Sequence, residues 1–199
     1  KGKLICHCSG AMTSNIFSGV TEAGAFGYSI HPMYAISSTT KSYREMQKCF
    51  FTVEGAEEWG NKLCRFIRLL GNDCVLLSTE NKTKYHAAAV FASNLVNGLY
   101  GSAVSLLEDC GFEEKQAEQA LVPLFMGNAS HIAEDGPVAG LTGPIERNDT
   151  TTVKKHLNVL DANEKHIYIS VSGAVLALAE QKYPDRDYSE MKKILSGQE

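Results

Sequence analysis

The chain has 199 residues, of which 44% are hydrophobic and 21% charged, and its formal net charge is −4. This length and composition are typical of a globular protein with one large or two small domains. The mild negative charge gives no electrostatic reason to expect nucleic acid or an anionic membrane surface as a partner. No apolar run reaches the roughly 18 to 20 residues that span a bilayer, and the start is too short in its apolar part for a signal peptide. We therefore expect a cytoplasmic protein.

Six cysteines occur in a chain without a recognisable secretory signal, so free thiols are expected in preference to disulfides. Cys6, His7 and Cys8 are metal-ligand types, but neighbours on a strand point to opposite faces. A second Cys or His pair at finger-like spacing does not follow. The sequence therefore predicts no metal site.

The first 80 residues alternate between strand and helix signals, which predicts an open α/β layer with crossover connections. The helix after residue 57 carries apolar residues at three- and four-residue spacing, the pattern that covers a sheet. The expected elements are a strand at 4–8, a weak helix at 14–23, a strand at 26–32, a loop at 37–42, a strand at 48–53, a helix at 57–70 and a strand at 73–78.

Beyond residue 80 the strand signal disappears, and the segments 83–109, 113–128, 150–160, 163–181 and 188–195 are predicted to be helices. Gly111 is placed to end the first of these helices. The predicted organisation is a partial Rossmann-like α/β domain at 1–80 and a helical domain at 81–199. Tyr85, Tyr100 and Tyr168 are expected to build the helical core or a dimer contact.

The α/β half holds only some four strands, and the chain contains no G-x-G-x-x-G turn. A doubly wound nucleotide domain normally begins with a strand, such a turn and a helix. Two interpretations remain open: the chain is a fragment, or its fold does not bind a dinucleotide.

Five ordered motifs mark the chain, namely His7–Ala11, Ser29–Met33, Phe51–Gly55, Lys82–Asn94 and Leu141–Asp149. Together they resemble one uncharacterised family that pairs a Rossmann-like domain with a helical C-terminal domain. Its members are described as NAD(P)-dependent oxidoreductases and are similar in plan to pyrroline-carboxylate reductases, ketopantoate reductases and 6-phosphogluconate dehydrogenases. The resemblance implies NAD or NADP as cofactor, and it implies that the family's glycine-rich phosphate loop lies outside this chain.

Polar residues at four-residue spacing begin the first predicted helix: Lys82, His86 and, further along the same stripe, Asn94. In the β-hydroxyacid dehydrogenase relatives, a Lys at this helix start and an Asn four residues later both reach the substrate. The resemblance therefore implies a substrate role for Lys82, with His86 at the position of the Asn. Lys can donate to a substrate oxygen, and His can relay a proton near neutral pH. We assign Lys82, His86 and Asn94 to catalysis; the alternative is a solvated Lys82 and a structural His86.

His7 and His31 each end a predicted strand, the position at which open α/β sheets bind ligands. Ser9 and Gly10 form a corner where backbone N–H groups can face a ligand. Together with Pro32, these residues are the predicted cofactor-binding set. The alternative is that each His only bonds its adjoining loop, and that His31, before Pro32, is a turn residue.

The segment 136–149 is the longest glycine- and proline-rich loop, and long ordered loops are often functional. We predict that Thr142, Arg147 and Asp149 bind substrate, because Arg147 suits a carboxylate or phosphate. Asp149 can orient Arg147 or cap the next helix, and an Arg–Asp pair closing that helix is the alternative. In related reductases such a loop often comes from the other subunit, so the resemblance implies a homodimer through the helical domain.

These observations favour an NAD(P)-dependent oxidoreductase that transfers hydride to or from a small carbonyl, imine or hydroxy acid. One alternative is a non-catalytic dimeric regulatory or interaction module without cofactor binding. A hydrolase or metal enzyme using His7, His31 and His86 ranks last, because no residue spacing demands such a site.

Overall fold

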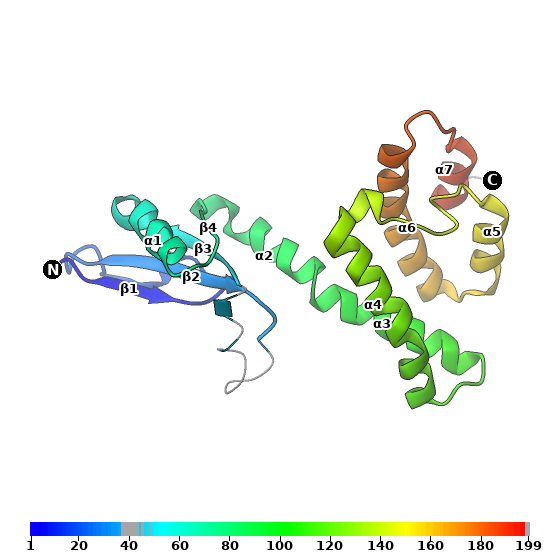
Figure 1. The fold of residues 1–199 in the computed structure, drawn as a ribbon, viewed down its shortest axis with the longest axis horizontal. Helices are drawn as coiled ribbons and strands as arrows, with labels where there is room; N and C mark the ends of the chain where they lie inside the picture. The colour runs from blue at the N-terminus through cyan, green and yellow to red at the C-terminus, as the bar shows by residue number, and fades with distance from the viewer. Residues whose placement is uncertain (37–43, 45, 48, 198–199) are drawn as a thin grey trace. The chain divides into compact units, whose positions relative to one another are not determined.

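The structure, a computed structural model, describes residues 1–36, 44, 46–47 and 49–197. It divides into two compact units, Lys1–Leu99 and Tyr100–Glu199. The first contains a sheet with its helices and the second is helical, which confirms the predicted fold class of an α/β layer followed by helices (Figure 1). The predicted loop at 37–42 lies outside the described residues.

The change from strands to helices falls near residue 80, as the sequence pattern indicates. The last strand, β4 (Cys74–Leu76), is followed by the short 3-10 helix η3 (Thr79–Asn81) and then by α2 (Lys82–Phe91). The division into compact units comes later, within α3 (Asn94–Asp109). The beginning of α2 therefore belongs to the same unit as the sheet.

The sheet has four strands in the order β1-β2-β3-β4. β1 (Leu4–His7) is parallel to β2 (Phe26–Met33), β2 is antiparallel to β3 (Phe50–Gly55), and β3 is parallel to β4. β1 lies at an edge, and three of its four residues are exposed.

The two central strands alternate between an apolar and a polar face. Tyr28 and Val53 point to the face covered by α1 (Glu57–Leu69), where Cys64 and Ile67 complete the core. The intervening residues of both strands are polar and face the opposite side, because side chains alternate along a strand. The second face is where α2 begins.

The predicted helix at 57–70 is confirmed as α1, with Glu57 and Glu58 in its first turn, where carboxylates favour the helix dipole. The helix predicted at 14–23 is wrong. Only the 3-10 helix η1 (Ser14–Ile16) forms, and turns follow it. Gly19 and Gly24 both have positive φ, which a continuing α-helix does not allow.

The single helix predicted at 83–109 is also wrong, because Ala92 and Ser93 form a turn between α2 and α3. The Ser93 hydroxyl donates to the Ala89 carbonyl at 2.7 Å, a bond that competes with regular helix pairing.

In the second unit, α4 (Glu114–Ala139) extends well beyond the predicted end at 128 and has a kink at Gly136, whose φ is +81°. The three remaining helices agree closely with the sequence pattern: α5 (Thr150–Val159), α6 (Ala162–Lys182) and α7 (Ser189–Ser196). Val153, Leu176 and Met191, one from each of them, meet in its core.

The stretch Thr79–Asp109 is long and apolar enough to cross a membrane by length and composition alone, and its most apolar part is not buried within the chain. One such stretch is weak evidence for a membrane span, because core helices of globular proteins and signal sequences have similar length and composition. The observation does identify an apolar helical surface that no described residue of the chain buries.

Gly55, opposite Tyr28 at the end of β3, has a φ of +146°, and a Cβ there would lie 2.3 Å from the Gly27 carbonyl oxygen. We expect Gly55→Ala to lower the free energy of unfolding by about 2 kcal/mol or more, through backbone strain and the clash. Urea denaturation measures this change. The control is Gly173→Ala, where a Cβ meets no atom within 4 Å; equal effects of the two variants would contradict the prediction.

Candidate functional site

The polar face of the central strands is buried. Ser29 and Glu54 are direct partners across β2 and β3, as are His31 and Thr52. Ser29 and Glu54 have no exposed surface, and Thr52 is 1% exposed. Polar residues at alternate strand positions usually face water, and burying them is costly unless they find partners. This face is therefore a candidate site.

Glu54 is held by three hydrogen bonds from two covering segments. Its carboxylate accepts from the backbone N–H of Ser14 at 2.9 Å, from the Ser14 hydroxyl at 3.0 Å and from the Thr79 hydroxyl at 2.8 Å. Ser14 begins η1 and Thr79 begins η3. One buried carboxylate thus fixes the β1–β2 connection and the approach to α2 on the same sheet face.

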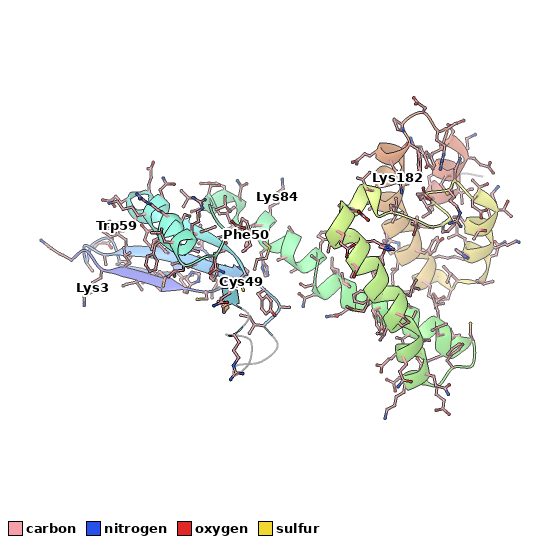
Figure 2. All side chains as sticks on the ribbon, in the orientation of Figure 1. Lys3, Cys49, Phe50, Trp59, Lys84 and Lys182 are labelled. Carbon is pink, nitrogen blue, oxygen red and sulfur yellow. The ribbon has the colours of Figure 1, made fainter. Side chains whose placement is uncertain are left out.

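Lys82, the first residue of α2, has no exposed surface at all. Its Nζ donates to the Ser29 hydroxyl at 2.7 Å and lies 5.4 Å from the centre of the Tyr85 ring. Burial lowers the pKa of Lys82, and the charge of Glu54 acts in the opposite direction. The interpretation of Lys82 as a solvated helix-start residue is wrong. Lys84, two residues later, is the exposed lysine of this turn (Figure 2).

The loop after β1 is tied to the same position. The Ser29 hydroxyl donates to the backbone carbonyl of Ser9 at 3.0 Å, and the Ser9 hydroxyl accepts from the backbone N–H of Met12 at 3.1 Å. His7 bonds within this loop through both ring nitrogens, to the Ser9 N–H at 3.1 Å and to the Thr13 carbonyl at 3.2 Å. His7 therefore shapes the loop.

His31 and Tyr85 form a pair on this face. His31 Nδ1 lies 2.7 Å from the Tyr85 hydroxyl, and the two rings meet edge to face. Burial lowers the pKa of His31, and the charges of Lys82 and His86 lower it further. Burial also raises the pKa of Tyr85. Both side chains are thus favoured in their neutral forms.

His86 lies one helical turn after Lys82 on α2 and approaches Gly10. A Cβ at Gly10 would lie 2.8 Å from His31 Nε2 and 3.1 Å from His86 Nδ1, so a glycine is required for both rings to come this close. His86 Nδ1 is enclosed and has no hydrogen-bond partner among the described residues. An unpaired buried polar atom is costly, and at a candidate site it calls for a functional explanation.

The structure thus brings together five of the predicted site residues, namely Lys82, His86, His31, Ser9 and Gly10. Pro32 lies next to His31 on β2 and is buried opposite Phe51 on the apolar side of the alternation. Asn94 is exposed after the break in the helix, where its Oδ1 accepts from Ser93 at 3.0 Å. The break removes Asn94 from the stripe that it was expected to share with Lys82.

Thr142, Arg147 and Asp149 lie in the second unit. Asp149 caps α5 by accepting from the backbone N–H and the hydroxyl of Thr152 at 3.0 and 2.6 Å, and these bonds lower the pKa of Asp149. Thr142 and Arg147 are exposed. The capping role proposed for Asp149 from the sequence is therefore present.

The loop that carries these residues is held by hydrogen bonds from side chains to main-chain carbonyls. Lys182 (Figure 2) donates to the carbonyls of Ala139 and Leu141 at 3.1 and 2.7 Å. Asn148 has a φ of +58° and donates to the Asp187 carbonyl at 2.8 Å. The loop is consequently well fixed, with Arg147 directed outward from it.

Sequence reasoning missed Tyr85 and Glu54. Tyr85 was expected in the helical core or a dimer contact, but its position three residues after Lys82 places it on the same face of α2. Glu54 is the charged residue of β3, and a carboxylate within a strand of mainly apolar residues was the signal that could have marked it.

Comparison with known proteins identifies the family. The family described as "Domain of unknown function (DUF2520)" matches residues 49–175. The chain belongs to this family. No curated protein sequence matches the chain.

Two solved structures are similar to this DUF2520 chain. Protein TM1727 from Thermotoga maritima is 25% identical with a TM-score of 0.74, over 90% of this chain and 70% of its own. The "putative NADP oxidoreductase BF3122" from Bacteroides fragilis is 22% identical with a TM-score of 0.62, over 91% of this chain and 65% of its own. These similarities support the predicted fold, a Rossmann-like α/β layer followed by helices.

The lowered pKa of His31 predicts a loss of stability in acid. Below its ordinary value of 6.5, the unfolded chain takes up a proton that the folded chain resists, so stability falls as the pH falls through that range. We expect His31→Gln to reduce the difference between the urea midpoints at pH 7 and pH 5. The exposed His166 supplies the control variant, His166→Gln; an unchanged pH dependence in His31→Gln would contradict the prediction.

Proposed function

We propose that this DUF2520 protein takes part in an NAD(P)-dependent oxidoreductase reaction, in which hydride passes to or from a small carbonyl, imine or hydroxy acid. The observation that carries the proposal is the complete burial of the Lys82 ammonium on a polar sheet face, beside His31 and His86. Buried, perturbed ionisable groups in such a cluster are typical of catalytic sites. The name of the Bacteroides fragilis neighbour points the same way.

The roles proposed for the residues follow from their chemistry. Lys82 and His86 would polarise or protonate the substrate, Lys82 chiefly through its charge, because its ammonium is covered. The nicotinamide would lie near the loop of Ser9 and Gly10 and near His31. Arg147 would hold an anionic group of the substrate.

The cofactor phosphates need a separate binding loop. This chain lacks the glycine-rich turn, and its edge strand β1 has three exposed residues, an edge at which further strands can pair. We propose that the phosphate-binding loop is carried by strands that adjoin this edge in the complete gene product.

The first test is a titration of NADPH and NADH against the complete gene product, followed by nicotinamide fluorescence, with the 199-residue chain alongside. We expect binding by the complete product. Absence of binding by both would overturn the oxidoreductase proposal and favour the non-catalytic interaction module.

Lys82→Met then tests the site in a screen of carbonyl and imine substrates. We expect kcat/KM to fall by about 100-fold or more, because a charge that stabilises the transition state is lost. Thermal stability should fall, because the variant leaves the buried carboxylate of Glu54 without its compensating charge, so kcat/KM is compared at a temperature at which both variants remain folded. The exposed Lys84 on the same turn gives the matched control, Lys84→Met. Equal activity of the two variants would exclude a catalytic role for Lys82.

We further propose that the apolar surface of α2 and α3 is covered by a second copy of the chain. Leu95 and Leu99 lie one turn apart on α3 and are 46% and 41% exposed, and Phe91, at the end of α2 before the break, is 70% exposed. Exposed apolar residues gathered in this way are typical of an interface.

Sedimentation of the chain tests this dimer. We expect a dimer that the double variant Leu95→Glu, Leu99→Glu converts to a monomer, because two carboxylates would be buried in the interface. Val159→Glu, at an isolated residue that is 82% exposed, is the control and should remain dimeric. A monomeric wild-type chain, or one that sediments only with lipid vesicles, would contradict the proposal.

A further inference from the structure

Three side chains close to Lys82, namely Tyr85, His31 and His86, bring a hydroxyl oxygen and ring nitrogens near one another. The Tyr85 hydroxyl contacts Nδ1 of His31, and Nε2 of His31 points to the same place above Gly10 as Nδ1 of His86. His86 is half-buried, and its other ring nitrogen, Nε2, is not enclosed without a partner among the described residues, as Nδ1 is. This series of side chains therefore runs from the half-buried Tyr85 hydroxyl through His31 to His86 and towards the surface of the site.

We propose that Tyr85 and His31 fix the ring tautomer of His86, so that His86 presents a neutral Nε2–H to an acceptor oxygen of the substrate. This inference rests on the proposed function and narrows its substrate class to carbonyl or hydroxy compounds. Tyr85 and His31 are positioning residues in this arrangement, and His86 is the residue that touches the substrate.

In the proposed arrangement, the Tyr85 hydroxyl donates to Nδ1 of His31, which leaves the His31 proton on Nε2. That N–H faces the side of Gly10 on which His86 Nδ1 lies without a partner. A small rotation of either ring lets His31 donate to His86 Nδ1, which leaves the His86 proton on Nε2.

The surroundings favour a neutral His31 ring and a Tyr85 hydroxyl that keeps its proton. His31 is half-buried and faces the Lys82 ammonium as well as His86, and all three influences disfavour a positive charge on it. Tyr85 is protected from ionisation by burial. A neutral imidazole N–H donates to a carbonyl oxygen and stabilises the negative charge that develops there when hydride arrives at the carbon.

Gly10 has a specific part in this arrangement. A methyl group at Gly10 would lie within van der Waals distance of both ring nitrogens and would force the rings apart. Gly10→Ala therefore separates His31 from His86 without removing either imidazole. Tyr85→Phe removes the first donor and leaves both rings in place.

The test is long-range ¹H–¹⁵N NMR of the histidine side chains of the 199-residue chain at pH 7, which reports the tautomer of each ring. We expect His31 and His86 of the wild type to carry their protons on Nε2. In Tyr85→Phe and in Gly10→Ala, the His86 signals should shift towards a mixture of tautomers. Gly173→Ala, whose Cβ meets no neighbour, is the control and should match the wild type.

Either of two results would overturn the inference: a wild-type His86 protonated on Nδ1, or His86 signals that both variants leave unchanged. The wild-type measurement needs no variant, so a variant that fails to fold does not prevent a decision. The measurement also needs no cofactor. If His86 carries its proton on Nε2 but no nicotinamide binds, the inference about the tautomer holds and the proposed function is overturned. If nicotinamide binds but His86 carries its proton on Nδ1, only the inference about the tautomer is overturned.

Discussion

The buried ammonium of Lys82 is the constraint on which the organisation of the first unit depends. A positive charge without access to water must be compensated by hydrogen bonds and by an opposite charge. Ser29 supplies the hydrogen bond and Glu54 the charge, and Glu54 is itself held by Ser14 and Thr79. The helix start, the sheet and the connection after β1 are thereby fixed around one polar cluster.

This cluster also explains why the two faces of one small sheet differ so sharply. The face under α1 is closed by apolar packing of Tyr28, Val53 and Ile67, an interaction that is non-directional. The opposite face is closed by directional contacts, in which a single lost partner leaves a buried group unpaired. The second face is therefore the one that can hold reacting groups in a fixed geometry.

Much of the fold could be predicted from the sequence, because it depends on local periodicity. The stripe of α1 and the capping Asp149 of α5 are encoded within a few residues. The two wrong predictions, the helix at 14–23 and the single helix at 83–109, have local causes that periodicity does not reveal. Positive-φ glycines stop a helix after η1, and the Ser93 hydroxyl accompanies the break between α2 and α3. Pairing direction in the sheet, in contrast, depends on contacts between distant segments.

The sequence by itself determined that Lys82 and His86 share a helix face and that His31 lies near the carboxyl end of a strand, since fixed spacing along regular elements decides such relations. Only the tertiary structure decided that these residues meet, that Lys82 is buried rather than solvated, and that Tyr85 and Glu54 belong with them. The reason is physical: burial and partner choice arise when segments some 20 to 50 residues apart close on one another, and local periodicity carries no information on that closure.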